Sequence, residues 1–176
     1  MKKAILMLIL ILSIIAINGC VQKPETGTLV MQLTDAPSEL NIEEVLVTIS
    51  NVEVHKAEAN EEENITSESG WFTVVEEAQT FDLVVIKDVK EFLGSKELED
   101  GKYTQVRLNV DKVFAIINGT EHNLTIPSKT IKLIKPFNVV ANQTTTLTLD
   151  FDVQESIHSA GIDKYVMKPT IKVIQE

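Results

Sequence analysis

The sequence has little of what catalytic or disulfide-stabilised domains commonly use. It contains one cysteine, one tryptophan and three histidines in 176 residues. A single cysteine excludes an internal disulfide framework, and no C-x-x-C or H-x-x-x-H spacing indicates a structural zinc site. No G-x-S-x-G segment is present to hold a serine nucleophile. We therefore expect no enzymatic activity, and we expect His55, His122 and His158 to be exposed surface histidines.

Positive charge is also scarce. The chain has 16 Lys and Arg against 26 Asp and Glu, a net charge of −10, and Arg107 is its only arginine. Residues 1–19 contain two lysines and no acid, so the chain without them has 14 basic and 26 acidic residues and a net charge of −12. Because nucleic acids attract basic surfaces, this composition excludes nucleic acid as an expected partner.

The long hydrophobic run is confined to the N-terminus. Two lysines precede an apolar run over residues 4–17, and small Gly19 comes directly before Cys20. This order predicts a signal peptide over residues 1–19, cleaved before Cys20. Residues 17–20 (Ile-Asn-Gly-Cys) resemble a lipobox, which predicts a lipid on Cys20 and an exported protein anchored to the outer face of the cell membrane. The alternative is an uncleaved signal anchor with an unmodified Cys20, which also exports the rest of the chain.

Period-two alternation dominates the sequence after a polar tether at residues 20–26. It predicts eight to ten short strands within a single domain over residues 27–176. The clearest predicted strand has an inward face formed by Leu147, Leu149, Phe151 and Val153. Almost no helical pattern is present. The fold class is therefore predicted to be all-β, an antiparallel β-sandwich with minor helical turns.

Local signals predict particular turns and irregularities. Asn118-Gly119 predicts a two-residue hairpin with positive φ at both residues. The inward phase shifts between Ser50 and Asn51, which predicts a β-bulge. Strands are predicted over residues 71–75 and 80–86, and residues 88–93 predict one helical turn ended by Gly94.

Four N-x-[ST] triplets are candidate glycosylation sites. They begin at Asn64, Asn118, Asn123 and Asn142. All four fall in predicted loops or hairpin ends, where glycan acceptors lie. The alternative is chance, because a chain rich in Asn and Thr produces such triplets without selection.

Three carboxylates are the candidate metal ligands. Asp150 and Asp152 alternate onto one predicted strand face, and Asp35 precedes Ala36-Pro37 in a predicted turn. Oxygen ligands suit calcium, but calcium needs about six to eight of them. We therefore expect no cofactor, with Asp35 capping its turn and Asp150 and Asp152 facing solvent or Arg107.

Two further residues invite a binding role. Arg107 shares an outward face with Gln105 and Asn109, and we interpret it as a structural residue bridging to a carboxylate rather than as a binding residue. Trp71 and Phe72 point to opposite faces and no aromatic row follows, so Trp71 is predicted to pack in the core or on the sheet rather than to stack a sugar.

Several segments resemble signature blocks of one known family. They are Gly27-Thr28-Leu29, Leu33-Thr34-Asp35-Ala36-Pro37, Val52-Glu53-Val54-His55, residues 103–110 (YTQVRLNV), residues 144–152 (TTTLTLDFD) and Lys168-Pro169-Thr170-Ile171. Together they resemble domain of unknown function 4382, found in exported archaeal and bacterial proteins that are often lipoproteins. The resemblance extends from Gly27 to about Val173. It implies an immunoglobulin-like or transthyretin-like β-sandwich outside the cell, and it implies no catalytic residues.

These signals favour delivery and scaffold over chemistry. We expect a lipid-anchored, non-enzymatic binding or structural module of the cell envelope, with an envelope protein or polysaccharide as its partner. One alternative is a carbohydrate-active enzyme or accessory domain that acts on envelope polysaccharide through Asp150 or Asp152. A calcium-dependent adhesion module is the other.

Overall fold

The computed structural model describes residues 24–35, 42–57 and 70–176. The predicted signal peptide, Cys20 and Asn64 lie outside the described residues. Within the described part, no helix is long and apolar enough to cross a membrane.

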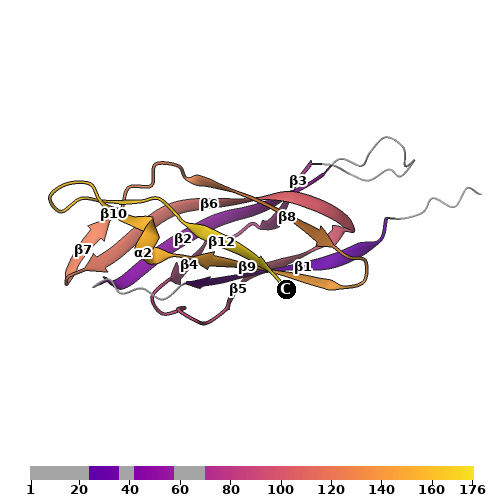
Figure 1. The fold of residues 1–176 in the computed structure, drawn as a ribbon, viewed down its shortest axis with the longest axis horizontal. Helices are drawn as coiled ribbons and strands as arrows, with labels where there is room; N and C mark the ends of the chain where they lie inside the picture. Colours follow the sequence, from indigo (N-terminus) through magenta and orange to yellow (C-terminus); the bar gives the residue numbers. More distant parts are fainter. Residues whose placement is uncertain (1–23, 36–41, 58–69) are drawn as a thin grey trace, which may run out of the picture.

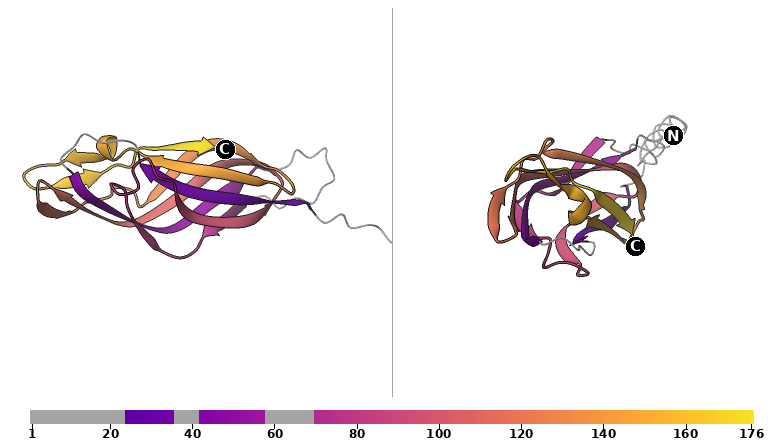
Figure 2. Two further views of the ribbon diagram at one scale, coloured as in Figure 1. Left: turned by 90° about the horizontal axis from the view of Figure 1, so that it is seen from below. Right: turned by 60° about the vertical axis from the view of Figure 1, so that its left-hand side comes forward.

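The strands form two facing sheets (Figures 1 and 2). The first has the order β12 (Ile171–Gln175), β9 (Thr144–Phe151), β1 (Thr26–Asp35) and β5 (Glu91–Glu99). The second has the order β3 (Gly70–Val75), β2 (Ile42–Lys56), β6 (Gly101–Ile117) and β7 (Thr120–Asn123), with β4 (Gln79–Asp82) also pairing with β2 and β8 (Thr130–Val139) with β6. A short helix, α2 (Val153–Ser156), leads into the small hairpin of β10 (Ile157–Ser159) and β11 (Tyr165–Met167).

The predicted all-β sandwich is confirmed, with one departure from a wholly antiparallel arrangement. β1 pairs with β9 in parallel, whereas the other described strand pairs are antiparallel. A parallel pair needs a long connection, and here the whole second sheet and β5 intervene in the chain between β1 and β9. β1 consequently lies between β5 and β9, inside its sheet.

The core fills the space between the sheets with one side of each strand. Leu29, Met31 and Leu33 of β1 are fully buried, as are Leu147 and Leu149 of β9. Each such side chain contributes about 1.5–3 kcal/mol when it leaves water. The alternation predicted for the strand at residues 144–151 is therefore confirmed, because its leucines face the second sheet.

Both local irregularities predicted for the second sheet are confirmed. Asn118 (φ 51°) and Gly119 (φ 71°) join Ile117 to Thr120, the φ pattern of a type I′ turn. The register of β2 against β6 shifts between Ile49 and Asn51, which keeps apolar residues inward on both sides of the shift. The hairpin lies at the end of the molecule opposite to the start of β1 (Figure 1).

The helical turn predicted over residues 88–93 is wrong. Asp88 has φ 60° in a turn, and β5 then runs through Gly94, which lies opposite Met31 rather than at a helix end. The register shifts between Met31 and Gln32, so the buried residues of β5, Leu93 and Leu98, are five positions apart. Because of this odd spacing, the sequence of β5 lacks the alternation of apolar and polar residues that indicates a strand.

The strand predicted over residues 80–86 is shorter than expected. β4 ends at Asp82, whose Oδ1 accepts hydrogen bonds from Val84 N (3.0 Å) and Val45 N (3.3 Å). An aspartate that accepts from the amide two residues later forms an Asx turn, which ends the extended backbone there. Leu83 and Ile86 remain buried despite the turn.

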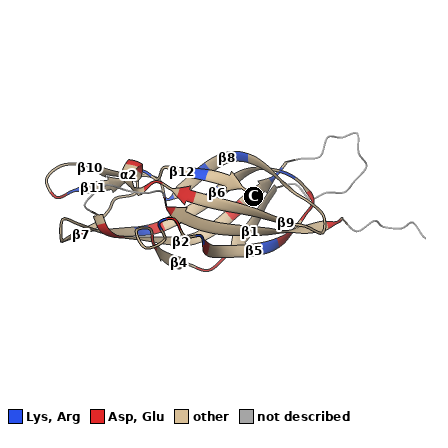
Figure 3. Ribbon diagram, turned by 60° about the horizontal axis from the view of Figure 1, so that its bottom comes forward, with Lys and Arg blue, Asp and Glu red and all other residues tan. Residues whose placement is uncertain are grey.

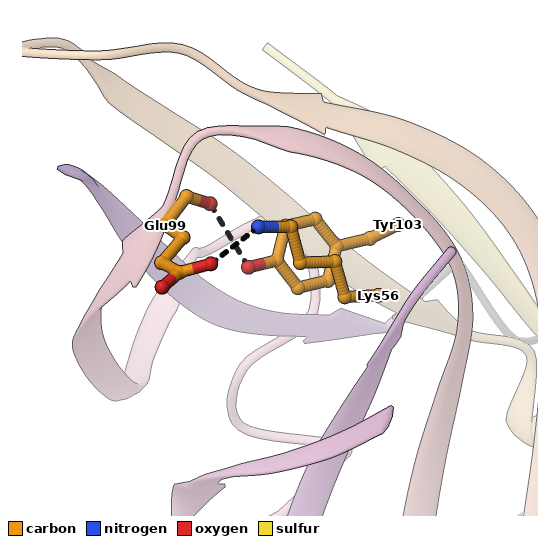
Figure 4. A network of polar contacts seen from close by, with 3 residues as sticks. All are labelled: Lys56, Glu99 and Tyr103. Atoms are coloured by element: carbon orange, nitrogen blue, oxygen red, sulfur yellow. Dashed lines mark hydrogen bonds and ion pairs between the residues drawn. The ribbon is translucent and has the colours of Figure 1, made fainter. Parts of the chain in front are cut away.

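A buried ion pair joins the two sheets at the end where β1 starts (Figure 4). Lys56 Nζ of β2 lies 2.7 Å from Glu99 Oε2 of β5, and the two side chains are 5% and 17% exposed. The Tyr103 hydroxyl donates to the Glu99 carbonyl oxygen at 3.0 Å. Burial, followed by the charges of Glu99 and Asp100, raises the pKa of Tyr103, which remains a neutral donor.

Candidate functional site

The outer face of the second sheet carries the densest group of interacting polar and aromatic side chains away from the core. His55 of β2 lies opposite Trp71 of β3 and Gln105 of β6, and Glu53 lies opposite Arg107. The intervening Val54 and Val106 are fully buried. Because successive strand residues point to opposite faces, these polar residues all turn away from the core. We call Trp71, His55, Thr104, Gln105 and Arg107 the outer-face cluster.

Arg107 stacks on Trp71. Its Cζ lies 3.5 Å from the centroid of the Trp71 ring, a distance typical of cation–π contacts. His55 packs against the same ring with centroids 4.8 Å apart and planes at 60°, and His55 Nδ1 is 3.2 Å from Thr104 Oγ1. The stack holds the guanidinium at one position and orientation on the sheet.

The guanidinium is fixed without being saturated. The Nε of Arg107 is buried and has no hydrogen-bond partner among the described residues. No described carboxylate forms an ion pair with it, although Glu53 occupies the opposite position on β2. The predicted carboxylate bridge of Arg107 is therefore not formed within the described part of the chain, and the stack on Trp71 replaces it. Trp71 packs on the sheet, as predicted.

A hydrogen-bonded ladder of amides and a hydroxyl lies beside Arg107. Asn109 follows two positions along β6, its Nδ2 donates to Asn51 Oδ1 at 3.3 Å, and its Oδ1 accepts from Thr130 Oγ1 at 2.8 Å. Lys132 lies opposite Arg107 on β8. Ile134, opposite Gln105, is 79% exposed. The outer-face cluster therefore continues along β2, β6 and β8 into a surface of mixed polar and apolar side chains.

Residues of both signs neighbour Arg107, with Glu53 opposite it on β2 and Lys132 opposite it on β8. Lys and Arg positions are interspersed with Asp and Glu positions along the described strands (Figure 3). Arg107 and Lys132 are neighbours in a chain with a large acidic excess. A guanidinium stacked on a ring keeps its N–H donors in its own plane, where they can meet the two oxygens of a carboxylate or phosphate.

Two of the three candidate calcium ligands accept hydrogen bonds from separate backbone amides. Asp35 is buried and its Oδ1 accepts from Val153 N at 3.1 Å, while Asp152 caps α2 by accepting from Glu155 N at 2.9 Å. Asp152 therefore leaves the strand face that it was predicted to share with Asp150. In the ranges 24–35, 42–57 and 70–176, no group of three or more His, Cys, Asp or Glu is arranged to hold a metal ion.

Asp150 stays on β9, opposite Lys172 of β12. Partial burial raises the pKa of Asp150, Lys172 opposes this rise, and Asp152 adds to it. Asp35 was expected to cap its own turn. That turn lies outside the described residues, and within them Asp35 Oδ1 accepts from Val153 N, an amide more than a hundred residues later in the chain.

The histidine prediction is partly wrong. His122 is only 9% exposed and packs edge to face on Tyr165, with ring centroids 4.7 Å apart. The contact comes from β11, which carries Tyr165 and lies far from β7 in the sequence, so no local pattern predicts it. His158 on β10 is exposed, and His55 is half-buried in the outer-face cluster.

Three of the four candidate glycosylation sites are described, and all three are exposed. Asn118 lies in the hairpin turn, Asn123 ends β7, and Asn142 has φ 58° in the turn between β8 and β9. Asn142 N donates to Thr26 O, so this site is beside the start of β1, whereas Asn118 is at the far end (Figure 1). Glycosylation remains a prediction for these residues.

A shallow groove of about 530 Å³ lies between β3 and β5. Lys96 at its wall forms an ion pair with Glu76 at 3.7 Å, and Gln79 donates to the Leu93 carbonyl oxygen at 2.9 Å. Lys96, Glu76 and Gln79 of the groove are therefore engaged with neighbouring groups. The outer-face cluster is the better candidate site, because its Arg107 forms no ion pair with a described carboxylate.

The fold and this face define the class: an all-β sandwich with a fixed cationic and aromatic cluster on an exposed sheet surface. The sequence model of the family described as "Domain of unknown function (DUF4382)" matches residues 26–169, and the chain belongs to this family. No curated protein matches the chain. Among solved structures, a leucine-rich repeat protein from Bacteroides thetaiotaomicron VPI-5482 is similar, with 17% identity and a TM-score of 0.27. That similarity covers 83% of this chain but only 15% of that protein.

Proposed function

We propose that the chain is a lipid-anchored, non-enzymatic binding module of the cell envelope, and that it binds its envelope partner through the outer-face cluster. The observation that carries this proposal is the Arg107 guanidinium, which is stacked on Trp71 on the outer face of the sheet and forms no ion pair with a described carboxylate. A planar cation held in one orientation without a carboxylate partner in the described part of the chain favours an external anion as its partner.

The position of the domain relative to the anchor supports display at a surface. β1 begins at Thr26, six residues after Cys20, and six residues extend over at most about 20 Å. A lipid on Cys20 would hold the start of β1 near the membrane, and the β6–β7 hairpin lies at the opposite end of the molecule (Figure 1). The outer face of the second sheet runs between these ends.

The two alternative functions have less support. A glycosidase with Asp150 and Asp152 as its acid and base needs both carboxylates free toward one substrate, and Asp152 accepts from a helix amide instead. A calcium-dependent adhesion module needs converging oxygens, and Asp35 and Asp152 are each bonded to backbone amides.

Two measurements test the proposal. Mass spectrometry of the native protein should find a lipid-modified Cys20 at the N-terminus, and Cys20→Ser should abolish the modification and leave the chain either uncleaved or released. Detection of a free Cys20 thiol within an intact signal would contradict the anchor.

The second measurement is binding of the purified chain to isolated cell envelopes of its source. Arg107→Ala should reduce binding, while Lys112→Ala, an exposed lysine further along β6, should not. Equal binding by all three proteins would exclude the outer-face cluster as the binding surface.

A further inference from the structure

We infer that the outer-face cluster binds the carboxylate of an acidic polysaccharide, a chain that carries uronic acid residues. This inference rests on the proposed envelope-binding function and names its ligand. It follows from the donors that Arg107 leaves available, from the backbone of the strands below it, and from the side chains around it.

The ligand atom is identified by the guanidinium. Arg107 is the only arginine of an acidic chain, and its stack on Trp71 fixes the plane of its donors. A fixed planar fork suits two oxygens held in one plane, which a carboxylate supplies. Lys132, beside Arg107, adds a second positive charge. Glu53 on the other side opposes an anion without pairing with Arg107.

The backbone below excludes the usual ways of holding a peptide. β2 and β6 are interior strands that pair on both sides along this face, so they offer no free edge to an added strand. The groove of about 530 Å³ is lined by residues of β3 and β5 and of the segment between β3 and β4, and not by β2 or β6. Recognition on this face therefore depends on side chains alone.

Those side chains suit a polyhydroxylated chain. The Asn51–Asn109–Thr130 ladder supplies amide and hydroxyl groups next to Arg107, and Gln105 and His55 continue it on the other side. Sugar hydroxyls are donors and acceptors that such groups can match. The exposed Ile134 and the edge of the Trp71 and His55 pair offer apolar contact to the C–H face of a sugar ring.

The test measures binding of the full chain in detergent micelles to four probes by calorimetry. The probes are tetragalacturonate, its methyl ester, neutral maltotetraose and tetraglutamate. Tetragalacturonate should bind best, and esterification should weaken it because the bidentate contact is lost. Arg107→Gln should weaken tetragalacturonate about tenfold to one-hundredfold, the range for hydrogen bonds to a charged group.

Two further variants separate a binding role from a structural one. Arg107→Lys keeps the charge and loses the fork, so it should also weaken binding. Glu53→Gln removes a like charge and should strengthen binding several-fold, whereas Lys112→Ala should leave it unchanged. If Glu53 were instead the working partner of Arg107, Glu53→Gln would lower the melting temperature and would not raise affinity, which would overturn the inference.

The remaining outcomes also decide. Equal binding of the methyl ester would overturn the carboxylate assignment, and equal binding of tetraglutamate would overturn the polysaccharide assignment. If no probe binds while envelopes still bind through Arg107, the ligand inference fails and the proposed function stands. If envelopes do not bind either, both fail.

Discussion

Removing one partner of the Lys56–Glu99 pair should destabilise the sandwich strongly, and the two single variants should differ in a defined order. The pair connects β2 of one sheet to β5 of the other (Figure 4). Breaking a buried ion pair costs about 3–5 kcal/mol when it leaves a charge without a partner or water. Lys56 has the less exposed side chain, at 5% against 17% for Glu99.

Glu99→Gln leaves the more buried charge unpaired, so we expect a loss of about 3 kcal/mol in the free energy of unfolding. Lys56→Met leaves Glu99, which water reaches, and it keeps an apolar stem close to Gly101, so we expect a smaller loss of about 2 kcal/mol. A Cβ at Gly101 would lie 3.1 Å from Lys56 Cε, which shows how closely this stem packs. The double variant leaves no lone charge and should be more stable than either single variant.

Urea unfolding followed by circular dichroism measures these differences, and the melting temperature of Glu99→Gln should fall by roughly 6–12 °C for a chain of this size. Lys102→Met, an exposed lysine near the same end, is the matched control. If the free energies of unfolding of the single variants lie within about 0.5 kcal/mol of the control, the usual range for surface substitutions, the Lys56–Glu99 pair does not stabilise the sandwich. Additive losses in the double variant would show that the two residues are not coupled.

Three more expectations concern the turn and the carboxylates. Gly119→Ala should cost about 1 kcal/mol, because φ is 71° there while space for a methyl group is open; an unchanged urea midpoint would show that the turn carries no such strain. Asp35→Ala should cost about 1–3 kcal/mol by leaving a buried amide unpaired, equally with calcium and with a chelator; a calcium-dependent melting temperature would revive the metal site. Asp150 has a raised pKa, so its folded form holds a proton to higher pH than its unfolded form, and stability is lost as pH rises above 3.8 through that window. Asp150→Asn should therefore be more stable than the parent at pH 7 and equal to it below about pH 3, and the reverse order would contradict this cause.

Features set by neighbouring residues were predictable from the sequence, and features set by distant pairing were not. Asn118-Gly119 determines its own turn, since both residues tolerate positive φ. β5 was missed because its bulge is imposed by pairing with β1 and leaves Leu93 and Leu98 out of phase. A one-residue shift moves side chains to the other face, and in β5 the only buried apolar residues are Leu93 and Leu98, too few to show alternation on both sides of the bulge, whereas β2 alternates on both sides of its shift.

The same limit applies to the candidate site. Alternation places Glu53 and His55 outward on β2 and Arg107 outward on β6, and the sequence shows that much. The contact of Arg107 with Trp71 depends on the register of three strands, which has no local sequence signal. The burial of His122 depends likewise on β11, which follows more than forty residues later.

Stability and binding make opposite demands at Arg107, and this opposition distinguishes a binding residue from a structural one. The aliphatic stem and the stack on Trp71 stabilise the sheet, but an unsatisfied buried Nε costs about 1–3 kcal/mol. Methionine would keep much of the packing and remove the unpaired donor. Arg107→Met should therefore unfold at the same or a higher urea concentration than the parent chain, while its binding to envelopes falls. A variant that lost stability along with binding would show that the arginine serves the fold, and the outer face would then need another explanation.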